Sequence, residues 1–215
     1  MIKEDLANIW RERKIADERV IEAFLKVPRE HFVLEELKRE AYSDQPLPIM
    51  CGKTISQPTT IVVMTSALEL KKGEKVLEVG TGSGYQAALI GSIVGEHGKV
   101  VSAEVVPELV RFSKSNLNKA GIKNVLVIEE DGSRGYEKAA PYDKILVTAA
   151  CPQVPEPLLA QLKTGGILVA PVGNLQHQEM LKLRKHERGF DKSSLGEFIF
   201  LPLVGKHGFS EEELD

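Results

Sequence analysis

The sequence predicts an α/β fold in which helices cover both faces of a doubly wound, mostly parallel β-sheet, preceded by a helical cap. Three observations support this prediction. From residue 76 onward, short apolar runs alternate with helical patterns, as is typical of parallel strands joined by crossover helices. A loop with glycines at alternate positions separates the first such strand from its helix. The 215 residues suffice for one substantial domain plus a modest appendage.

The composition disfavours several classes of function, including nucleic-acid binding and membrane insertion. The chain is 42% hydrophobic and 27% charged, with a net charge of −3, which is ordinary for a folded protein and disfavours a broad basic surface for nucleic acid. No apolar run approaches the ~20 residues that span a bilayer, and Met1 to Asp5 lack a signal-peptide pattern. Cys51 and Cys151 are far apart, and the five histidines are scattered. We therefore expect a cytoplasmic protein with reduced thiols and no metal, membrane or nucleic-acid partner. We also expect a monomer, although the sequence itself carries no signal for the oligomeric state.

Residues 1–57 are predicted to form a helical cap with a lid loop. Helical spacing of apolar residues predicts helices over 2–13 and 17–27, with Asp17 as the cap of the second helix and Pro28 ending it. Residues 41–57 contain two prolines and a glycine among apolar residues. This composition indicates an ordered, irregular loop of the kind that is often functional.

Residues 58–215 are predicted to form the core and to belong, with the cap, to a single integrated domain. A helix should run from Pro58 to about Leu70 and end at Lys71-Lys72-Gly73. The later elements follow from apolar runs and their flanking glycines and prolines. Strands are expected at 76–79, 100–105, 125–128, 144–148 and 167–172, and helices at 86–94, 107–120 and 155–162. A turn is expected at Gly165-Gly166. Two last strands, which can pair antiparallel, are expected at 180–184 and 198–204 with a polar loop between them, followed by a solvated tail at 211–213.

The loop Gly80-Thr81-Gly82-Ser83-Gly84 is the main functional signal. Alternate glycines allow a sharp turn and the close approach of a ligand, and the helix start that follows favours an anionic group. A dinucleotide site needs its third glycine one place later, where this chain has Tyr85. The spacing, with Glu78 in the preceding strand, instead resembles motif I of S-adenosylmethionine-dependent methyltransferases. A purely structural turn is the alternative.

Two acidic residues at the expected carboxyl ends of later strands support a nucleoside-type site. Glu104 ends its strand twenty residues after Gly84, where a carboxylate can hold both ribose hydroxyls. Asp131, after the next strand, can accept a hydrogen bond from an exocyclic amine such as that of adenine. Taken alone, Asp131 reads better as an ordinary turn residue before Gly132. Cys151 is predicted to be a buried thiol and not a nucleophile, because no histidine or basic cluster accompanies it.

Several separate stretches together resemble the protein-L-isoaspartate (D-aspartate) O-methyltransferase family. The resemblance covers about residues 15 to 208, and its most specific part is Thr54-Ile55-Ser56-Gln57-Pro58. Thr59 departs from the aromatic or histidine residue of many members. The other matching stretches are Ala41 to Ile49, Leu77 to Tyr85, Asp131-Gly132-Ser133, Ala140 to Asp143, Pro152 to Gly166 and Pro171-Val172-Gly173.

The resemblance implies a fold of the class I S-adenosylmethionine-dependent methyltransferase (Rossmann-like) type and a repair reaction. A methyl group would pass from S-adenosylmethionine, leaving S-adenosylhomocysteine, to the free carboxylate of L-isoaspartyl and, less well, D-aspartyl residues in age-damaged proteins and peptides. A succinimide would follow and partly restore aspartate.

The resemblance also implies roles for single residues. Ser56 matches the active-site serine. The cofactor would contact Thr54, Ile55 and Ser56, Gly80 and Gly82 at its methionine portion, Glu104 at the ribose and Asp131-Gly132 at the adenine. Ser56 and Leu203-Val204-Gly205 would line the substrate cleft.

The chemistry fits this sparse set of residues. A carboxylate is ionised at neutral pH and needs no strong base, so orientation and exclusion of water are the main tasks. Ser56 offers a hydroxyl and an N–H beside a helix start, which suits positioning of a carboxylate; a plain helix cap is the alternative.

Three rival functions remain open. A methyltransferase for RNA or a small molecule is disfavoured by Thr148-Ala149-Ala150-Cys151, which stands where amino-methylating enzymes of nucleic acids usually carry an Asn/Asp-Pro-Pro-aromatic motif. A dehydrogenase module is disfavoured by Tyr85. A non-catalytic binding module is disfavoured by the presence of Ser56, Glu104 and Asp131.

Overall fold

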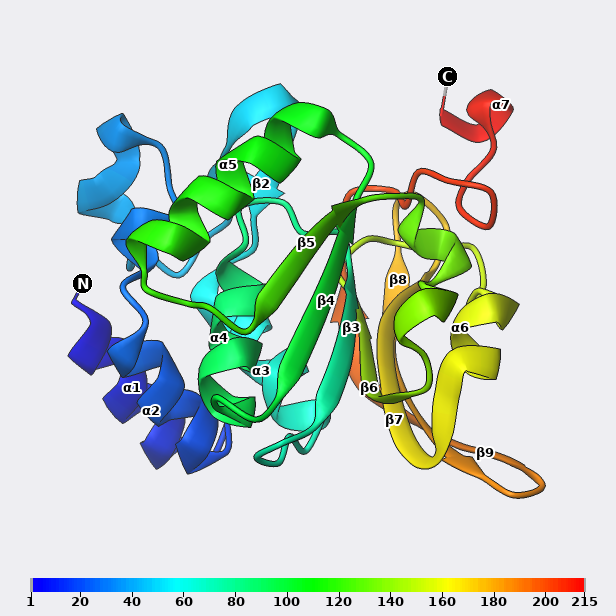
Figure 1. Cartoon of the computed structure of the whole chain (residues 1–215). Helices are drawn as coiled ribbons and strands as arrows, with labels where there is room; N and C mark the ends of the chain where they lie inside the picture. Colours follow the sequence, from blue (N-terminus) through cyan, green and yellow to red (C-terminus); the bar gives the residue numbers. More distant parts are fainter. Residues whose placement is uncertain (1, 215) are drawn as a thin grey trace.

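The computed structural model describes residues 2–214 and shows a seven-stranded sheet between two layers of helices (Figure 1). The helices are α1 Lys3–Glu12, α2 Glu18–Lys26, α3 Pro58–Ala67, α4 Tyr85–Val94, α5 Pro107–Lys119, α6 Glu156–Gln161 and α7 Glu211–Leu214. The strands are β1 Leu47–Pro48, β2 Thr54–Ile55, β3 Lys75–Val79, β4 Lys99–Glu104, β5 Val125–Glu129, β6 Tyr142–Val147, β7 Leu162–Gly173, β8 Gln178–His186 and β9 Gly189–Phe198. The predicted α/β class and mostly parallel sheet are confirmed.

The sheet order is β5-β4-β3-β6-β7-β8-β9. Strands β3 to β7 run parallel, β8 is antiparallel to β7, and β9 is antiparallel to β8. The order changes direction between β3 and β6, and ligands of such sheets bind outside the carboxyl ends of the strands at this point. Helices α3, α4 and α5 cover one face of the sheet and α6 the other (Figure 1).

The N-terminal cap is packed onto the core. Helix α1 packs on α2, and α2 packs on α3 and α4. One cluster of buried apolar residues contains Trp10 and Phe24 from the cap together with Leu89 of α4 and Leu109 of α5. Segments 2–57 and 58–214 therefore share a hydrophobic core.

The cap elements agree with the expected ranges, with additions that the sequence did not indicate. Asp17 caps α2, accepting a hydrogen bond from the Arg19 N–H. Short 3-10 helices occupy Arg29–His31 and Glu35–Glu40, and residues 41–57 contain the small antiparallel hairpin of β1 and β2. The predicted irregular loop is thus a hairpin held over the core.

Three expected boundaries were wrong. Helix α3 ends at Ala67, because Glu69 adopts a left-handed φ of 53° and its carboxylate binds Lys182 and Arg184. Gly165 and Gly166, expected to form a turn, lie within β7. The residues expected to form a polar loop after Arg184 instead form β9 and its turn with β8.

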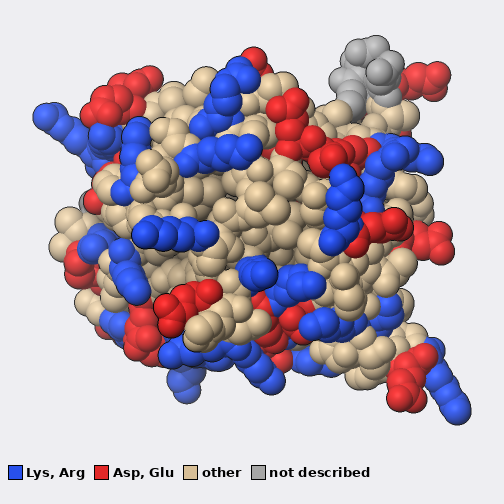
Figure 2. All heavy atoms as spheres, viewed as in Figure 1, with Lys and Arg blue, Asp and Glu red and all other residues tan. Residues whose placement is uncertain are grey.

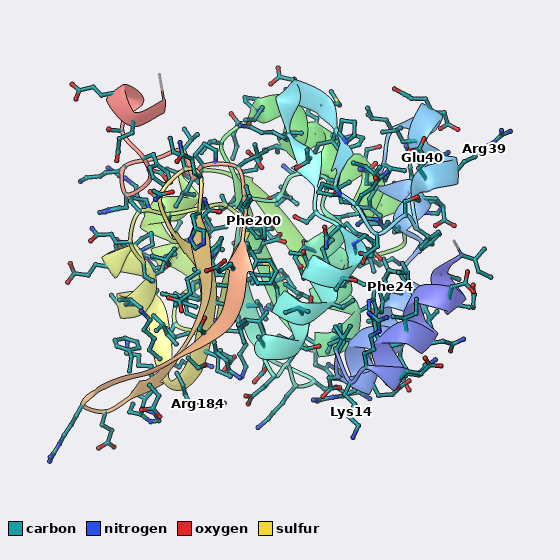
Figure 3. All side chains as sticks on the ribbon, turned by 180° about the vertical axis from the view of Figure 1, so that it is seen from behind. Lys14, Phe24, Arg39, Glu40, Arg184 and Phe200 are labelled. Carbon is teal, nitrogen blue, oxygen red and sulfur yellow. The ribbon has the colours of Figure 1, made fainter. Side chains whose placement is uncertain are left out.

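The expected last strand at 198–204 was also wrong. Residues 199–204 form no strand, and in the described chain their only ladder contact is an isolated bridge between Pro202 and Ala150. This segment follows the C-terminal end of β9, which lies at the same edge of the sheet as the carboxyl ends of the parallel strands, where a ligand is expected. In Figure 3, seen from behind, Phe200 lies at that end of the sheet and Arg184 at the opposite end.

Candidate active site

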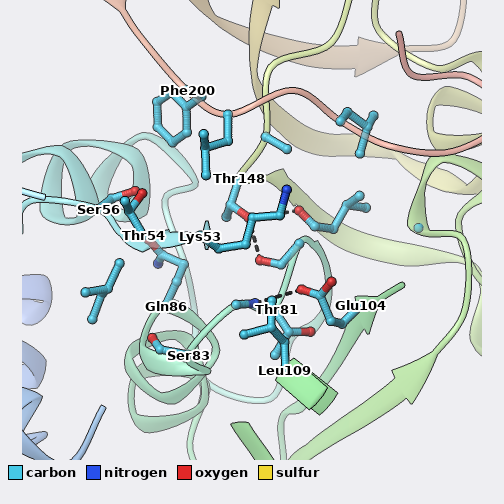
Figure 4. Close-up of a pocket in the computed structure, with 18 of the residues that line it drawn as sticks. Lys53, Thr54, Ser56, Thr81, Ser83, Gln86, Glu104, Leu109, Thr148 and Phe200 are labelled. Carbon is cyan, nitrogen blue, oxygen red and sulfur yellow. Dashed lines mark hydrogen bonds between the residues drawn. The ribbon is translucent and has the colours of Figure 1, made fainter. Parts of the chain in front are cut away.

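A cavity of about 200 Å³ opens at the carboxyl ends of β3, β4 and β6 (Figure 4). Its walls come from segments that are far apart in the sequence. The lining residues fall at 53–56, 61, 64, 79–83, 85–86, 103–106, 109, 132, 148–149 and 200–204. The cavity therefore lies at the place that the strand order indicates for a ligand.

The glycine loop forms the cavity floor after β3. Gly80, Gly82 and Gly84 have φ values of 97°, 52° and 87°, a region that other residues rarely adopt. A Cβ on Gly80 would lie 2.5 Å from the Thr148 hydroxyl oxygen. Both the backbone conformation and the close approach of Thr148 therefore require glycine at position 80.

Glu104 is fixed at the edge of this loop. One carboxylate oxygen accepts the Gly82 N–H at 3.0 Å, and the other accepts the N–H groups of Val105 and Val106 at 3.0 and 3.1 Å. A carboxylate has about four acceptor positions. Glu104 is thus oriented by the backbone and can still accept hydrogen bonds from a ligand, as a role at a ribose requires.

A buried polar chain supports the loop from below. The Ser102 hydroxyl donates to the carboxyl group of Glu78 and lies 2.6 Å from the Thr81 hydroxyl oxygen. Glu78 is fully buried, and this burial raises its pKa to about 8. Its second oxygen has no hydrogen-bond partner within residues 2–214. Glu78 is therefore protonated at neutral pH.

Ser56 lies on the opposite wall, directly before α3. The Arg29 guanidinium donates to the Ser56 carbonyl oxygen at 2.8 Å. The Ser56 hydroxyl has no hydrogen bond in the described chain, and the helix is capped at Gln57 without a side-chain bond. The helix-cap alternative for Ser56 is therefore not realised, and its hydroxyl remains available to a ligand.

Thr59 ties the cap to the lid instead of lining the cavity. It donates from its N–H and hydroxyl to the Asp44 carboxylate at 2.9 and 2.6 Å, and its hydroxyl oxygen accepts the Trp10 indole N–H at 2.9 Å. This residue, which departs from the pattern of many family members, is thus occupied in holding the first helix, the lid segment and α3 together.

The structure brings most of the predicted site residues to one cavity. Nine of them line it: Thr54, Ile55, Ser56, Gly80, Gly82, Glu104, Gly132, Leu203 and Val204. Asp131 and Gly205 do not. The Asp131 carboxylate accepts the Lys206 N–H at 2.8 Å and the Ser133 N–H and hydroxyl at 3.0 and 2.7 Å. Asp131 thereby holds the C-terminal segment against the end of β5.

Sequence reasoning missed several lining residues. Lys53 and Gln86 contribute polar side chains, and Thr148 donates its hydroxyl to the carbonyl oxygens of Val79 and Gly80 at 2.9 and 2.5 Å. Phe200 supplies an aromatic ring to the rim. Lys53 adjoins the specific Thr-Ile-Ser motif, which was a usable signal; no local pattern marks the other three.

The two cysteines, the metal-binding side chains and the surface charge of the described residues concern the expectations about reactivity and partners. Cys51 and Cys151 are free thiols, and burial raises the pKa of Cys151 to about 12, which keeps it in the unreactive thiol form. No metal-type cluster occurs among these residues, and no helix among them is long and apolar enough to cross a bilayer. Lys and Arg side chains lie among Asp and Glu across the face shown in Figure 2.

Comparisons with known proteins agree with this geometry. The family model "Protein-L-isoaspartate(D-aspartate) O-methyltransferase (PCMT)" matches residues 1–208. Proteins named protein-L-isoaspartate O-methyltransferase from Methanosarcina mazei and Pyrococcus horikoshii are 49% and 50% identical, over 91% and 92% of this chain and 80% and 90% of theirs.

A solved structure from Plasmodium falciparum is also similar. It is described as a beta-aspartate methyltransferase (PCMT) in complex with S-adenosyl-L-homocysteine. It is 27% identical, with a TM-score of 0.81 over 93% of this chain and 97% of that chain. The family match over nearly the whole sequence, the fold and the glycine-loop cavity agree: this chain belongs to the protein-L-isoaspartate (D-aspartate) O-methyltransferase family of S-adenosylmethionine-dependent enzymes.

Proposed function

We propose that this chain methylates the free carboxylate of L-isoaspartyl residues, and less efficiently D-aspartyl residues, in age-damaged proteins and peptides. The methyl donor is S-adenosylmethionine, and the product ester leads through a succinimide to partial restoration of aspartate. The observation that carries this proposal is the unbonded Ser56 hydroxyl, which lies across one cavity from the glycine loop and Glu104.

The residues of the cavity fit the cofactor. Gly80 and Gly82 leave room for the methionine portion, and the oriented Glu104 carboxylate suits the ribose hydroxyls. Thr54 and Ile55 of β2 cover this portion from the lid side, and Gly132 borders the adenine end. Asp131 would reach the adenine only if its bond to the Lys206 N–H were exchanged; otherwise its part is to hold Gly205 and the substrate cleft in place.

Ser56, Leu203 and Val204 are proposed to receive the substrate. Leu203 and Val204 follow the last strand and present an apolar wall, with Val204 45% exposed. When bound, the sulfonium cofactor supplies an activated methyl group. Because sulfonium and carboxylate charges disappear in the transition state, the protein should orient the carboxylate without stabilising its charge strongly. A single neutral hydroxyl such as that of Ser56 suits this need.

Paired peptides test the proposal. Transfer of a labelled methyl group should be seen with a peptide containing L-isoaspartate and not with the same sequence containing aspartate. Labelling of both peptides, or of neither, would overturn the substrate assignment. Adding RNA as a third acceptor separates the rival nucleic-acid methyltransferase, for which transfer to RNA alone is expected.

The oligomeric state, the location and the partners of the chain are also proposals. The chain is proposed to act as a cytoplasmic monomer with no nucleic-acid or membrane partner, on the support of its free thiols and its mixed surface charge. Light scattering on the purified chain tests the oligomeric state, and a mass twice that of the chain would contradict it.

A further inference from the structure

Lys53 occupies a fixed position over the glycine loop. It ends the turn of the β1–β2 hairpin, in which Cys51 and Gly52 have left-handed φ values of 58° and 65°. Its N–H donates to the Met50 carbonyl at 3.2 Å, and its own carbonyl accepts the Ile49 N–H at 2.8 Å. The terminal carbon of Ile49 lies 3.8 Å from where a Cβ on Gly82 would be. The hairpin thus places Lys53 on the lid side of the methionine end of the cavity.

The charges of the cavity wall single out Lys53. Among the described lining residues, Lys53 and Glu104 are the only charged side chains. Glu104 already accepts backbone N–H groups at both oxygens. The Lys53 ammonium has no hydrogen bond or ion pair with any residue in 2–214 that the structure describes. A half-buried cation without a counter-ion, on a largely apolar wall, is suited to an anionic ligand group.

Two carboxylates meet in the proposed reaction, and the chemistry distinguishes them. The substrate carboxylate loses its charge in the transition state, so a cation bound to it would stabilise the ground state and slow the transfer. The amino-acid carboxylate of the cofactor keeps its charge throughout. A cation at that group strengthens binding without opposing the chemical step.

We propose that the Lys53 ammonium binds the amino-acid carboxylate of the cofactor, making Lys53 a cofactor-specificity residue that favours ligands carrying this group. The inference rests on the proposed function, because it requires S-adenosylmethionine as the ligand. The β1–β2 hairpin thereby supplies a positive charge to the cavity in addition to covering it. A bound cofactor then contacts both the hairpin and the glycine loop.

Calorimetry with two ligands tests this assignment. S-adenosylhomocysteine carries the carboxylate, whereas 5′-methylthioadenosine has the same adenosine and thioether without it. The variant Lys53→Met removes the charge while keeping an unbranched side chain. It should weaken binding of S-adenosylhomocysteine about 10-fold, the loss of one hydrogen bond between charged groups, and change binding of methylthioadenosine less than about twofold.

Two further variants serve as controls. Lys53→Arg keeps the positive charge and should restore most of the affinity. Lys99→Met removes an exposed lysine at the start of β4, away from the cavity, and should change neither affinity. Equal losses for both ligands in Lys53→Met would indicate altered lid packing and overturn the proposal.

The remaining outcomes separate the two proposals. Unchanged affinity for S-adenosylhomocysteine with a raised KM for the isoaspartyl peptide would assign Lys53 to the substrate carboxylate and overturn the inference alone. If the unaltered chain binds neither S-adenosylhomocysteine nor methylthioadenosine, the proposed function fails with it.

Discussion

Arg29 links the cap, the lid and the site through one buried side chain. Its guanidinium donates to the carbonyl oxygens of Ala41 at 2.7 Å and Ser56 at 2.8 Å, and it lies 5.1 Å from the centre of the Tyr85 ring. It is fully buried, which lowers its pKa to about 10, so it remains charged at neutral pH. Arg29 therefore holds both ends of the lid segment against the residue that follows the glycine loop.

Arg29→Met should reduce turnover with an isoaspartyl peptide more strongly than it reduces cofactor affinity. The substitution leaves the Ala41 and Ser56 carbonyls without their donor, at a cost of about 1–3 kcal/mol each, and releases the Ser56 backbone. Steady-state kinetics and calorimetry with S-adenosylhomocysteine measure the two effects, with thermal melting to verify folding. Arg29→Lys should recover part of the turnover; unaltered turnover in a folded Met variant would exclude a positioning role.

Ser56→Ala should lower turnover about 10-fold or more with little effect on cofactor affinity. The reason is the loss of the hydroxyl that orients the substrate carboxylate, since a small misplacement of reacting groups can cost up to about 100-fold in rate. Single-turnover methyl transfer to the isoaspartyl peptide measures it. Ser115→Ala, at an exposed position of α5 that does not line the cavity, is the matched control. Full activity of Ser56→Ala would show that the Ser56 hydroxyl has no role in catalysis.

At the scale of elements, we propose that residues 41–57 and the N-terminal helices form a lid over the cofactor. The hairpin of β1 and β2 contributes Lys53 to Ser56 to the cavity wall, and its turn packs on α5. A bound cofactor would contact both the hairpin and the glycine loop. Opening of the lid should then be coupled to ligand release.

Limited proteolysis with trypsin tests the lid. S-adenosylhomocysteine should slow cleavage after Lys53, because ligand-bound chains open this segment less often. Cleavage after Arg188, in the exposed turn between β8 and β9, serves as the internal control and should be unaffected. Identical cleavage at Lys53 with and without ligand would argue against a lid.

The elements that the sequence predicted best are the ones buried on both sides. Continuous apolar runs, such as Val76 to Val79, have no competing interpretation once glycine and helix patterns flank them. Strand β9 was missed because its residues are almost all exposed at a sheet edge, so no alternation of apolar and polar residues marks it. The run from Ile199 to Val204 has the apolar composition of a strand, but residues 200–204 line the cavity instead of extending the sheet.

Some residues of the candidate site can be predicted from local sequence patterns, and others are placed only by the packing of distant segments. The glycine loop, Glu104 and Ser56 follow from spacing and from family resemblance. Gln86 and Thr148 line the cavity because of how distant segments pack, and no local pattern specifies that. Lys53 could have been found from its place beside the Thr-Ile-Ser motif. The same packing places Asp131 against Lys206 and away from the cavity wall.

At the scale of the whole molecule, Glu78 makes stability depend on pH. Its pKa is about 8 in the folded chain against an ordinary value of 4.5. Between these values the folded chain binds more protons than the unfolded chain, so this residue lowers the free energy of unfolding as pH rises. Its contribution is most favourable below pH 4.5 and is progressively lost up to about pH 8.

Glu78→Gln should remove this dependence. The variant keeps the shape of the side chain without an ionisable group, so its melting temperature relative to the unaltered chain should rise steadily between pH 5 and pH 8. Melting curves across this range provide the measurement. Glu130→Gln, at an exposed position, is the control and should show a flat difference; a flat difference for Glu78→Gln would mean that this carboxyl is ionised in the folded chain.

The walls of the cavity extend from residue 53 to residue 204, and this has a consequence for biosynthesis. A nascent chain on the ribosome has the glycine loop early but lacks the closing wall until its C-terminal segment has emerged. The binding energy of the cofactor is therefore gained only by finished chains, and a truncated product receives no such protection from unfolding.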